Sequence, residues 1–189
     1  MSWLLVIGLL AAAGVLIVLE HQGFRTTLSL SMRGDIKRES RFLAQYGQSV
    51  CAPLTALLVW ELDATDPGRR ALTILLASIG ASLSGGVLKR LFGRVRPNRQ
   101  HAGRFLGFTW RHANWRESFP SSHAAAAVAM SVVLAAFYPQ AAETFWCLAI
   151  ACAALRYLLD AHWPSDVLAG IALGYVCGWA AVEGMARYA

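Results

Sequence analysis

Apolar residues along this chain gather in six runs that are separated by shorter polar stretches. The runs cover about residues 3–19, 47–62, 71–92, 120–138, 143–160 and 164–184. Each approaches the length of about 20 residues that an α-helix needs to cross the hydrocarbon core of a bilayer. The pattern predicts an all-α polytopic membrane bundle with about six transmembrane helices, in one domain over residues 1–189.

The stretch over about residues 24–46 has a different pattern. Apolar side chains such as Phe24 and Ile36 are interleaved there with five basic residues: Arg25, Arg33, Lys37, Arg38 and Arg41. A basic amphipathic helix of this kind lies in the plane of the membrane surface. We therefore predict a surface helix between the first two spans.

The composition agrees with a membrane protein and narrows its partners. Hydrophobic residues make up 57% of the chain and charged residues 15%, against about 25% charged in an ordinary globular domain. The net charge is +6, which suits anionic head groups and phosphorylated lipids. A membrane lipid substrate and the bilayer are the expected partners, nucleic acid is not, and the oligomeric state is left open.

Cysteines and regularly spaced glycines have structural interpretations. All four cysteines lie inside apolar runs without Cys-x-x-Cys spacing, so we interpret them as small buried hydrophobic residues: Cys51, Cys147, Cys152 and Cys177. In the last run, small residues recur every four positions, which predicts a face for close helix packing: Gly170, Gly174 and Gly178.

Six spans with short connections place alternate loops on the same side of the membrane. The end of the third span, the start of the fourth, the end of the fifth and the start of the sixth therefore share one side. The other side receives both termini, the loop at 63–70 and the turn at 139–142. Because the unusual polar residues all fall on the first side, we expect a functional site there.

The first polar stretch ends the third span with basic residues. Lys89 and Arg96 lie seven positions apart, on either side of Gly93, where the helix is expected to stop. Two such cations can neutralise the oxygens of a phosphate group. Taken alone, they are explained more simply as a cationic helix end in contact with lipid head groups.

The second stretch, Pro120-Ser121-Ser122-His123, opens the fourth span. Proline suits the first helical turn, and the free N–H groups there bind anions with the help of the helix dipole. Ser121 adds a hydroxyl donor, and His123 can give or take a proton near neutral pH. A serine-rich helix cap is the alternative interpretation of this stretch by itself.

The third stretch joins the fifth and sixth spans and holds Arg156, His162 and Asp166. An aspartate four positions after a histidine can hold the ring by Nδ1 and leave Nε2 free to attack. Arg156 offers a planar fork of donors that suits a phosphate. The alternative is an interfacial histidine with ordinary charged neighbours.

Together, the three stretches predict a phosphoryl-transfer site. Lys89, Arg96 and Arg156 would neutralise the non-bridging oxygens, and two histidines would divide the nucleophile and acid roles. The sequence contains no Asp-x-Asp, His-x-x-x-His or Walker glycine loop. We therefore expect side chains to supply the positive charge, with no metal site and no cofactor.

These stretches resemble the three motifs of the type 2 phosphatidic acid phosphatase (PAP2) superfamily of membrane lipid phosphatases. Its first motif is Lys, six residues, Arg-Pro, and the chain from Lys89 to Pro97 matches it in full. Its second is Pro-Ser-Gly-His, in which Ser122 replaces the glycine. Its third is Ser-Arg, five residues, His, three residues, Asp, in which Leu155 replaces the serine.

The resemblance implies an enzyme with a two-step mechanism. His162, oriented by Asp166, attacks phosphorus and forms a phosphohistidine, and His123 protonates the departing oxygen. Water then hydrolyses the intermediate. Five residues would hold the phosphate oxygens: Lys89, Arg96, Ser121, Ser122 and Arg156.

The resemblance leaves several substrates open. Similar members act on undecaprenyl pyrophosphate, phosphatidylglycerophosphate, phosphatidic acid or lipid A phosphates, and the small single-domain form makes undecaprenyl pyrophosphate our first choice. A phosphotransferase using the same site is an alternative, and a non-catalytic lipid-binding protein is a remote one. For Arg94, Arg99 and Arg104 we expect solvated loop charges rather than a second phosphate site.

The distribution of basic residues conflicts with the orientation that the resemblance implies. The site-bearing side carries 14 of the 17 Lys and Arg residues, and the positive-inside rule would place such a side in the cytoplasm. The resemblance implies a bacterial inner-membrane protein whose site faces outward. Because many of these arginines can serve the substrate, we expect the site on the periplasmic face.

Overall fold

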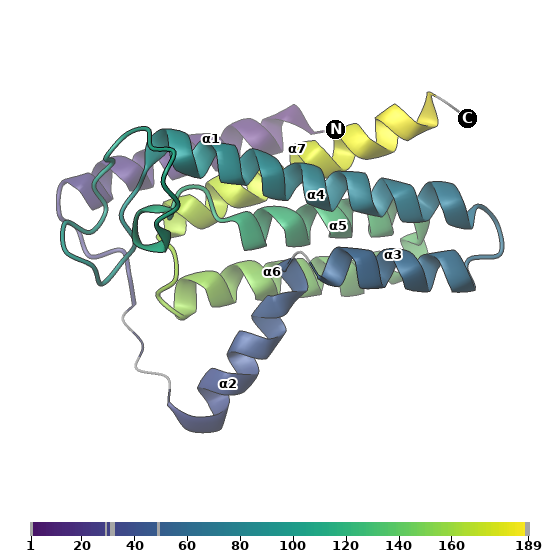
Figure 1. Cartoon of the computed structure of the whole chain (residues 1–189), viewed down its shortest axis with the longest axis horizontal. Coiled ribbons are helices and arrows are strands. Elements are labelled where there is room, and N and C mark those ends of the chain that lie inside the picture. Colours follow the sequence, from purple (N-terminus) through teal and green to yellow (C-terminus); the bar gives the residue numbers. More distant parts are fainter. Residues whose placement is uncertain (1, 29, 31–32, 49, 188–189) are drawn as a thin grey trace.

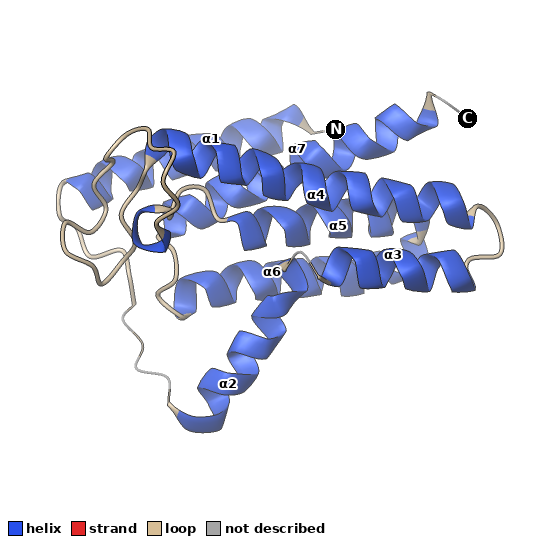
Figure 2. Cartoon of the chain, viewed as in Figure 1, coloured by secondary structure: helices blue, strands red, loops and turns tan. Residues whose placement is uncertain are grey.

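The structure is a computed structural model of the chain, and it describes residues 2–28, 30, 33–48 and 50–187. This described part is helical and contains no strand (Figures 1 and 2). Its α-helices are α1 (Trp3–His21), α2 (Gly34–Leu43), α3 (Cys51–Leu62), α4 (Pro67–Phe92), α5 (Ser122–Phe137), α6 (Ala142–Leu158) and α7 (Pro164–Ala186). Short 3₁₀ turns lie between them: η1 (Ala44–Gly47), η2 (Asn114–Arg116) and η3 (Pro139–Ala141).

The predicted all-α membrane bundle is confirmed, and each of the six apolar runs contains a helix. Among the described residues, four spans are long and apolar enough to cross a membrane: Trp3–His21, Pro67–Phe92, Pro139–Leu158 and Pro164–Ala186. A fifth candidate is the bent pair formed by Gly34–Gly47 and Cys51–Leu62. α5 is apolar but has only 16 residues, which is less than a helix needs to span a bilayer alone.

α5 is the central helix of the bundle (Figure 1). It packs against α4, α6 and α7, and most of its residues are buried. Its alanine-rich sequence lets the neighbouring helices approach closely. α5 is apolar on all sides. This is the pattern expected of a helix that is enclosed by protein and has no solvent-facing side.

The predicted glycine face of the last span packs against α5 and is confirmed as a packing surface. A Cβ atom on any of three glycines would collide with a backbone carbonyl oxygen of the central helix or of the residue that precedes it: Gly170 with Ser121, Gly174 with Ala125, and Gly178 with Ala129. Small residues therefore set the distance between α5 and α7.

The predicted surface helix over residues 24–46 is shorter than expected, and this boundary is corrected. α2 covers only Gly34–Leu43, residues 24–28 are not helical, and residues 29, 31 and 32 lie outside the described part. Tertiary contacts hold the non-helical segment: the Tyr157 hydroxyl donates to the carbonyl of Thr26 at 2.7 Å. The Thr26 hydroxyl in turn donates to Glu20 at 3.2 Å.

The interpretation of all four cysteines as buried residues is corrected at one position. Cys152 is buried and Cys51 and Cys177 are partly buried, but Cys147 is exposed. Cys147 lies on α6, which belongs to a span long and apolar enough to cross a membrane, and the unpacked side of such a helix is expected to face lipid. An apolar run therefore does not by itself imply burial against protein in a membrane bundle.

The two ends of the bundle differ in character (Figure 1). The loop of residues 93–121, the end of α1 and the connection between α6 and α7 gather at one end. The turn between α3 and α4, the η3 turn and the end of α7 lie at the opposite end. The polar stretches singled out in the sequence thus share one end of the molecule.

Candidate active site

The loop of residues 93–121 carries part of the site on ordered backbone. α4 ends where Gly93 adopts a left-handed conformation with φ of 58°, which glycine tolerates better than other residues. Three positions further on, the amide of Arg96 donates to the carbonyl of Trp115 at 2.9 Å. Arg96 therefore projects from a fixed main chain.

The starts of α5 and α7 are tied together. Pro164 occupies the first turn of α7, and Asp166 accepts a hydrogen bond from the amide of Trp163, the N-cap residue, at 3.0 Å. This is the usual arrangement of a helix start with an acidic residue in its first turn. The amide of Ser121, which precedes α5, donates to the carbonyl of Asp166 at 2.9 Å. The second and third motifs are thus held side by side.

His162 is fully buried between these helix starts, with its ring oriented by the backbone. Its Nδ1 lies 2.8 Å from the carbonyl oxygen of Ser118 and 3.7 Å from Oδ2 of Asp166. The sequence predicted Asp166 as the partner of Nδ1, but the nearer acceptor is this carbonyl. Since a carbonyl can only accept, Nδ1 carries the proton and Nε2 holds a free lone pair. Among the described residues, Nε2 has no hydrogen-bond partner.

The environment of His162 keeps its imidazole neutral at physiological pH. Burial lowers the pKa of His162 to about 4, and the positive charges of Arg96 and Lys89 act in the same direction. The carboxylate of Asp166 opposes this shift but does not overcome it. The ring is therefore a neutral base whose Nε2 lone pair is not engaged by any described residue.

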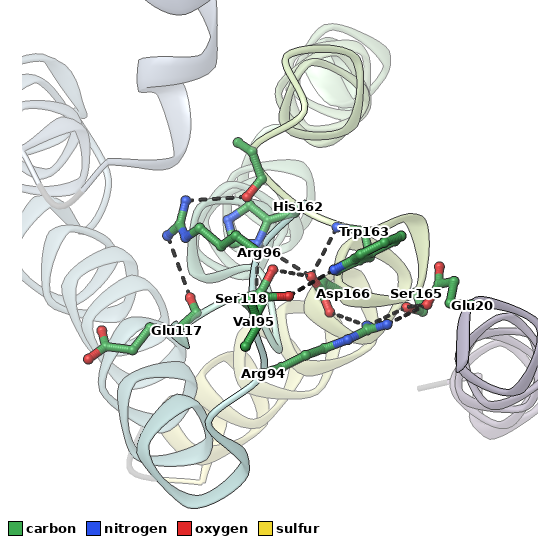
Figure 3. A network of polar contacts seen from close by, with 11 residues as sticks. Glu20, Arg94, Val95, Arg96, Glu117, Ser118, His162, Trp163, Ser165 and Asp166 are labelled. Atoms are coloured by element: carbon green, nitrogen blue, oxygen red, sulfur yellow. Dashed lines mark hydrogen bonds and ion pairs between the residues drawn. The ribbon is translucent and has the colours of Figure 1, made fainter. Parts of the chain in front are cut away.

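Asp166 is also fully buried, and each of its carboxylate oxygens is engaged (Figure 3). Oδ1 accepts a hydrogen bond from Nη1 of Arg94 at 2.5 Å. Oδ2 accepts from the hydroxyl of Ser118 at 2.5 Å, in addition to the Trp163 amide. The carboxylate is held in a fixed position 3.7 Å from the ring of His162.

The expectation that Arg94 is a solvated loop charge is wrong. Its side chain is only 1% exposed, and it forms ion pairs with both Asp166 and Glu20. Its guanidinium also lies 5.0 Å from the ring centroid of Phe105 and 5.3 Å from that of Trp163. Paired carboxylates and aromatic rings together make burial of this cation tolerable.

Arg96 lies beside His162 and is held by carbonyl groups (Figure 3). Its Nη1 donates to the carbonyl of Ala161 at 3.2 Å, and its Nη2 contacts the carbonyl of Glu117 at 3.5 Å. Burial lowers the pKa of Arg96, and nearby carboxylates oppose that shift. With its high reference pKa, the guanidinium remains a cation next to the imidazole.

The remaining predicted residues are brought to the same place. Lys89 lies in the last turn of α4, Arg156 in the last turn of α6, and His123 in the first turn of α5. All three are partly buried. The charges of Lys89, Arg96 and Arg156 act on His123 and on one another, as expected for groups that surround a common space.

The two serines of the second motif differ in environment. Ser121 is fully buried, and its hydroxyl has no hydrogen-bond partner among the described residues. Ser122 is partly buried, with its hydroxyl facing α4. A Cβ atom on Gly85 would lie 2.9 Å from the Ser122 hydroxyl. The side chain that replaces the family's glycine is therefore accommodated opposite a glycine in the next helix.

A cavity of about 750 Å³ opens beside Arg96 and Ala161, the residue that precedes His162. Its size is in the range of small-molecule sites. Cations from α2, from the residue that precedes it and from the loop line the cavity: Lys37, Arg33, Arg96 and Arg99. Of the arginines expected to be solvated, Arg99 and Arg104 are indeed exposed. The described residues contain no group of three or more His, Cys, Asp or Glu side chains suited to a metal ion.

Three residues of this site were missed by sequence reasoning: Glu20, Arg94 and Ser118. The available signals were weak. Glu20 directly follows the first apolar run and lies in the last turn of α1, and an ionisable residue within a membrane-spanning helix is often functional. Arg94 and Ser118 lie inside or beside matched motifs, but nothing in their spacing indicates that they meet Asp166.

Two curated relatives share the motif-bearing part of the chain. The lipid A 1-phosphatase of Rhizobium etli is 38% identical over 101 residues, which cover 52% of this chain and 42% of that protein. The lipid A 1-phosphatase of Rhizobium johnstonii is 36% identical over 95 residues, covering 50% of this chain and 39% of that protein. The chain thus spans about two fifths of the length of the curated relatives it matches.

A solved structure has a fold similar to that of this chain, and a family model matches the part of the chain that contains the three motifs. The crystal structure of a transmembrane PAP2-type phosphatidylglycerolphosphate phosphatase from Bacillus subtilis has a TM-score of 0.67 and 19% sequence identity, covering 99% of this chain and 95% of that one. The model of the PAP2 superfamily matches residues 70–188, which is more than half of the chain and includes all three motifs. The chain therefore belongs to the PAP2 superfamily.

Proposed function

We propose that this protein is a membrane phosphatase that hydrolyses a lipid phosphate through a phosphohistidine intermediate. The observation that carries the proposal is the state of His162. Its imidazole is buried and neutral, Nδ1 is fixed by the Ser118 carbonyl, and Nε2 is free. A nucleophile oriented in this way next to several cations is what attack on an anionic phosphate requires.

In the first step, Nε2 of His162 forms a bond to phosphorus while the bond to the ester oxygen breaks in line. His123, in its protonated form, gives a proton to the departing oxygen. In the second step, water attacks phosphorus, the P–N bond breaks, and His123 recovers a proton from that water. The products are the free lipid alcohol and inorganic phosphate, and both histidines return to their starting states.

The cations and helix starts have distinct tasks in these steps. Lys89, Arg96 and Arg156 balance the charge of the equatorial oxygens, so that side chains supply the positive charge. The free hydroxyl of Ser121 and the amide groups at the start of α5, including that of Ser122, donate hydrogen bonds to the same oxygens. Asp166 offsets the positive charge that the ring of His162 acquires when it is phosphorylated.

Among the substrates expected from the sequence, we place a lipid A phosphate first. Both curated relatives are named for the 1-phosphate of lipid A, whereas none of the compared proteins is named for undecaprenyl pyrophosphate, our first choice from the sequence. The cavity beside Arg96, with its additional cations from α2, offers room for a large anionic head group. Phosphatidylglycerophosphate, phosphatidic acid and undecaprenyl pyrophosphate remain the comparison substrates.

The test is phosphate release by the purified protein in detergent with EDTA present, for wild type, His162→Ala and His21→Ala. The lipid panel contains a lipid A phosphate, phosphatidylglycerophosphate, phosphatidic acid and undecaprenyl pyrophosphate. We expect release by wild type and by His21→Ala, which alters an exposed histidine at the end of α1, and none by His162→Ala. Substantial release by His162→Ala, or no release by wild type from any lipid, would overturn the proposal.

The reaction product distinguishes a phosphatase from a phosphotransferase that uses the same site. A phosphatase yields inorganic phosphate in the absence of any acceptor other than water. Formation of a phosphorylated lipid or sugar only when an acceptor is added would assign the transferase instead.

We further propose that the protein lies in a bacterial inner membrane with the site on the periplasmic face. Ala102 is exposed in the loop at the site end, so Ala102→Cys, in a background lacking the exposed Cys147, reports the orientation. An impermeant maleimide added to intact spheroplasts is expected to label it. Protection until the membrane is permeabilised would place the site in the cytoplasm.

A further inference from the structure

We propose that Glu20, in the last turn of α1, is a positioning residue of the active site that acts on Asp166 through Arg94. This inference rests on the proposed phosphatase function, because it concerns the carboxylate that supports His162. The family model matches only residues 70–188, so Glu20 lies outside the part of the chain that defines the family.

The three charged groups form a continuous buried chain (Figure 3). Nη2 of Arg94 lies 2.6 Å from Oε2 of Glu20, and Nη1 of Arg94 lies 2.5 Å from Oδ1 of Asp166. The hydroxyl of Ser165 connects the same atoms, since it accepts from Nη1 of Arg94 at 2.6 Å and donates to Oε2 of Glu20 at 2.5 Å. One guanidinium thus bridges α1 and α7.

Burial makes each of these three charged groups depend on its partners. The side chains of Glu20 and Asp166 are 0% exposed, and that of Arg94 is 1% exposed. In such surroundings a charged group that loses its partner keeps its desolvation cost without compensation. With Glu20 in place, both terminal nitrogens of Arg94 are committed, and the guanidinium is held where it meets Oδ1 of Asp166.

The carboxylate of Glu20 also sets the net charge behind the nucleophile. Arg94 alone would neutralise Asp166, and the pair would offer little to the positive charge that His162 gains on phosphorylation. Two carboxylates around one guanidinium leave a net negative charge of one behind the ring. Electrostatic stabilisation of developing charge is strong in a buried site. Glu20 therefore restores the negative charge near His162 that Arg94 would otherwise cancel.

α1 has contacts of its own that do not need this ion pair. It packs along α7, Val6 and Ala13 are buried, and the amide of Ser2 donates to the hydroxyl of Tyr175 at 3.3 Å. A neutral residue at position 20 would keep that packing. The buried network of Glu20, Arg94 and Asp166 is therefore better explained by a role in the active site than by a role in packing α1 against α7.

The test compares kcat and KM for wild type, Glu20→Gln, Glu20→Asp and Glu61→Gln on a lipid phosphate that wild type hydrolyses. Gln keeps the shape of Glu20 but removes its charge. Glu61 provides the matched control, since it is an exposed carboxylate in the last turn of another helix, α3. We expect Glu20→Gln to lower kcat on the order of tenfold, the lower end of the loss seen when a metal-bound histidine loses its outer hydrogen-bond partner, with KM unchanged. Glu20→Asp should recover most of kcat, and Glu61→Gln should match wild type.

The outcomes separate this inference from the proposed function. If wild type is active and His162→Ala is inactive, but Glu20→Gln retains the wild-type kcat, the inference fails while the function stands. A lower thermal midpoint with unchanged kcat would likewise assign Glu20 a purely structural role and overturn the inference. A rise in KM alone would make Glu20 a substrate-binding group, which also contradicts it.

A second variant covers the case in which Glu20→Gln does not fold. Ser165→Ala removes only the hydroxyl that links Arg94 to Glu20 and leaves both charges in place. A lower kcat with unchanged KM supports the positioning role, and wild-type values of both constants contradict it.

Discussion

Nδ1 of His162 lies 2.8 Å from the carbonyl oxygen of Ser118 but 3.7 Å from Oδ2 of Asp166. The tautomer of the ring is therefore fixed by the backbone, and the carboxylate contributes its charge from slightly further away. Asp166 in turn accepts from the hydroxyl of the same Ser118. One residue thus contacts both members of the pair, the ring through its carbonyl and the carboxylate through its side chain.

This division of tasks predicts a limited loss in Asp166→Asn. Where a carboxylate itself selects the tautomer of a catalytic histidine, its amide variant loses about 10⁴ in kcat. Here the Ser118 carbonyl still holds the proton on Nδ1, so we expect a loss of about 10² from the missing charge alone. Steady-state kcat on a lipid phosphate, with the elution profile as a check of folding, measures it. A loss of 10⁴ or more would show that the carboxylate, not the carbonyl, sets the tautomer.

The lowered pKa of His162 predicts acid sensitivity of the folded state. The pKa is about 4 in the folded protein and about 6.5 in an unfolded chain. Between these values the unfolded state binds more protons, so the free energy of unfolding decreases as pH falls from 6.5 toward 4, by about 3 kcal/mol in total. Thermal unfolding in detergent at pH 7 and pH 4.5 should show a smaller decrease for His162→Gln than for wild type. Equal decreases in both proteins would contradict the assignment.

The glycine face of α7 predicts a position-dependent response to alanine. In Gly174→Ala the new Cβ collides with the Ala125 carbonyl of α5, and we expect a loss of about 1–3 kcal/mol of stability from overpacking. Gly184→Ala in the same helix meets no atom within 4 Å and should be neutral or slightly stabilising, because alanine favours a helix over glycine. Thermal midpoints in detergent compare the two variants. Equal thermal midpoints for Gly174→Ala and Gly184→Ala would mean that α5 and α7 can move apart without a loss of stability.

Ser122 and Gly85 are predicted to compensate for one another. A methyl group at position 85 would lie 2.9 Å from the Ser122 hydroxyl, which pushes the start of α5 away from α4. We expect Gly85→Ala to lower kcat, because the amide groups at that helix start face the phosphate in the proposed mechanism. The double variant Gly85→Ala/Ser122→Gly removes the opposing hydroxyl and should recover activity. If the double variant is no better than Gly85→Ala, the two positions do not interact.

The cations of the cavity predict a preference for head groups with more than one phosphate. Lys37 lines the cavity, so Lys37→Glu should raise KM for a bisphosphorylated lipid by about fivefold, equivalent to ~1 kcal/mol for a partly screened charge, with kcat unchanged. Arg38→Glu is the matched control on the same helix, since Arg38 is absent from the cavity lining and pairs with Asp35 at 3.0 Å. The difference should shrink at high salt. Equal effects of both variants would assign the change to general surface charge.

The arrangement of the helices could largely be predicted from the sequence. Long apolar runs must become helices in a bilayer, where backbone groups have no water to bond, and glycines four positions apart mark a packing face wherever they occur. The surface helix was overestimated because an interleaved pattern at residues 24–28 does not reveal the bond between Tyr157 and Thr26 that holds this segment. Contacts between residues so distant in the chain leave no periodic signal.

The sequence by itself determined the family and predicted eight site residues, because Lys89, Arg96, His123, His162 and their neighbours stand in motifs whose spacing is local to a helix start or a helix end. Only the tertiary structure decided what surrounds those residues. The partner of His162 is a backbone carbonyl, which every residue carries and no motif can single out. Arg94 and Glu20 lie 74 positions apart in the chain, and their pairing depends on burial, which forces charges to find one another across helices.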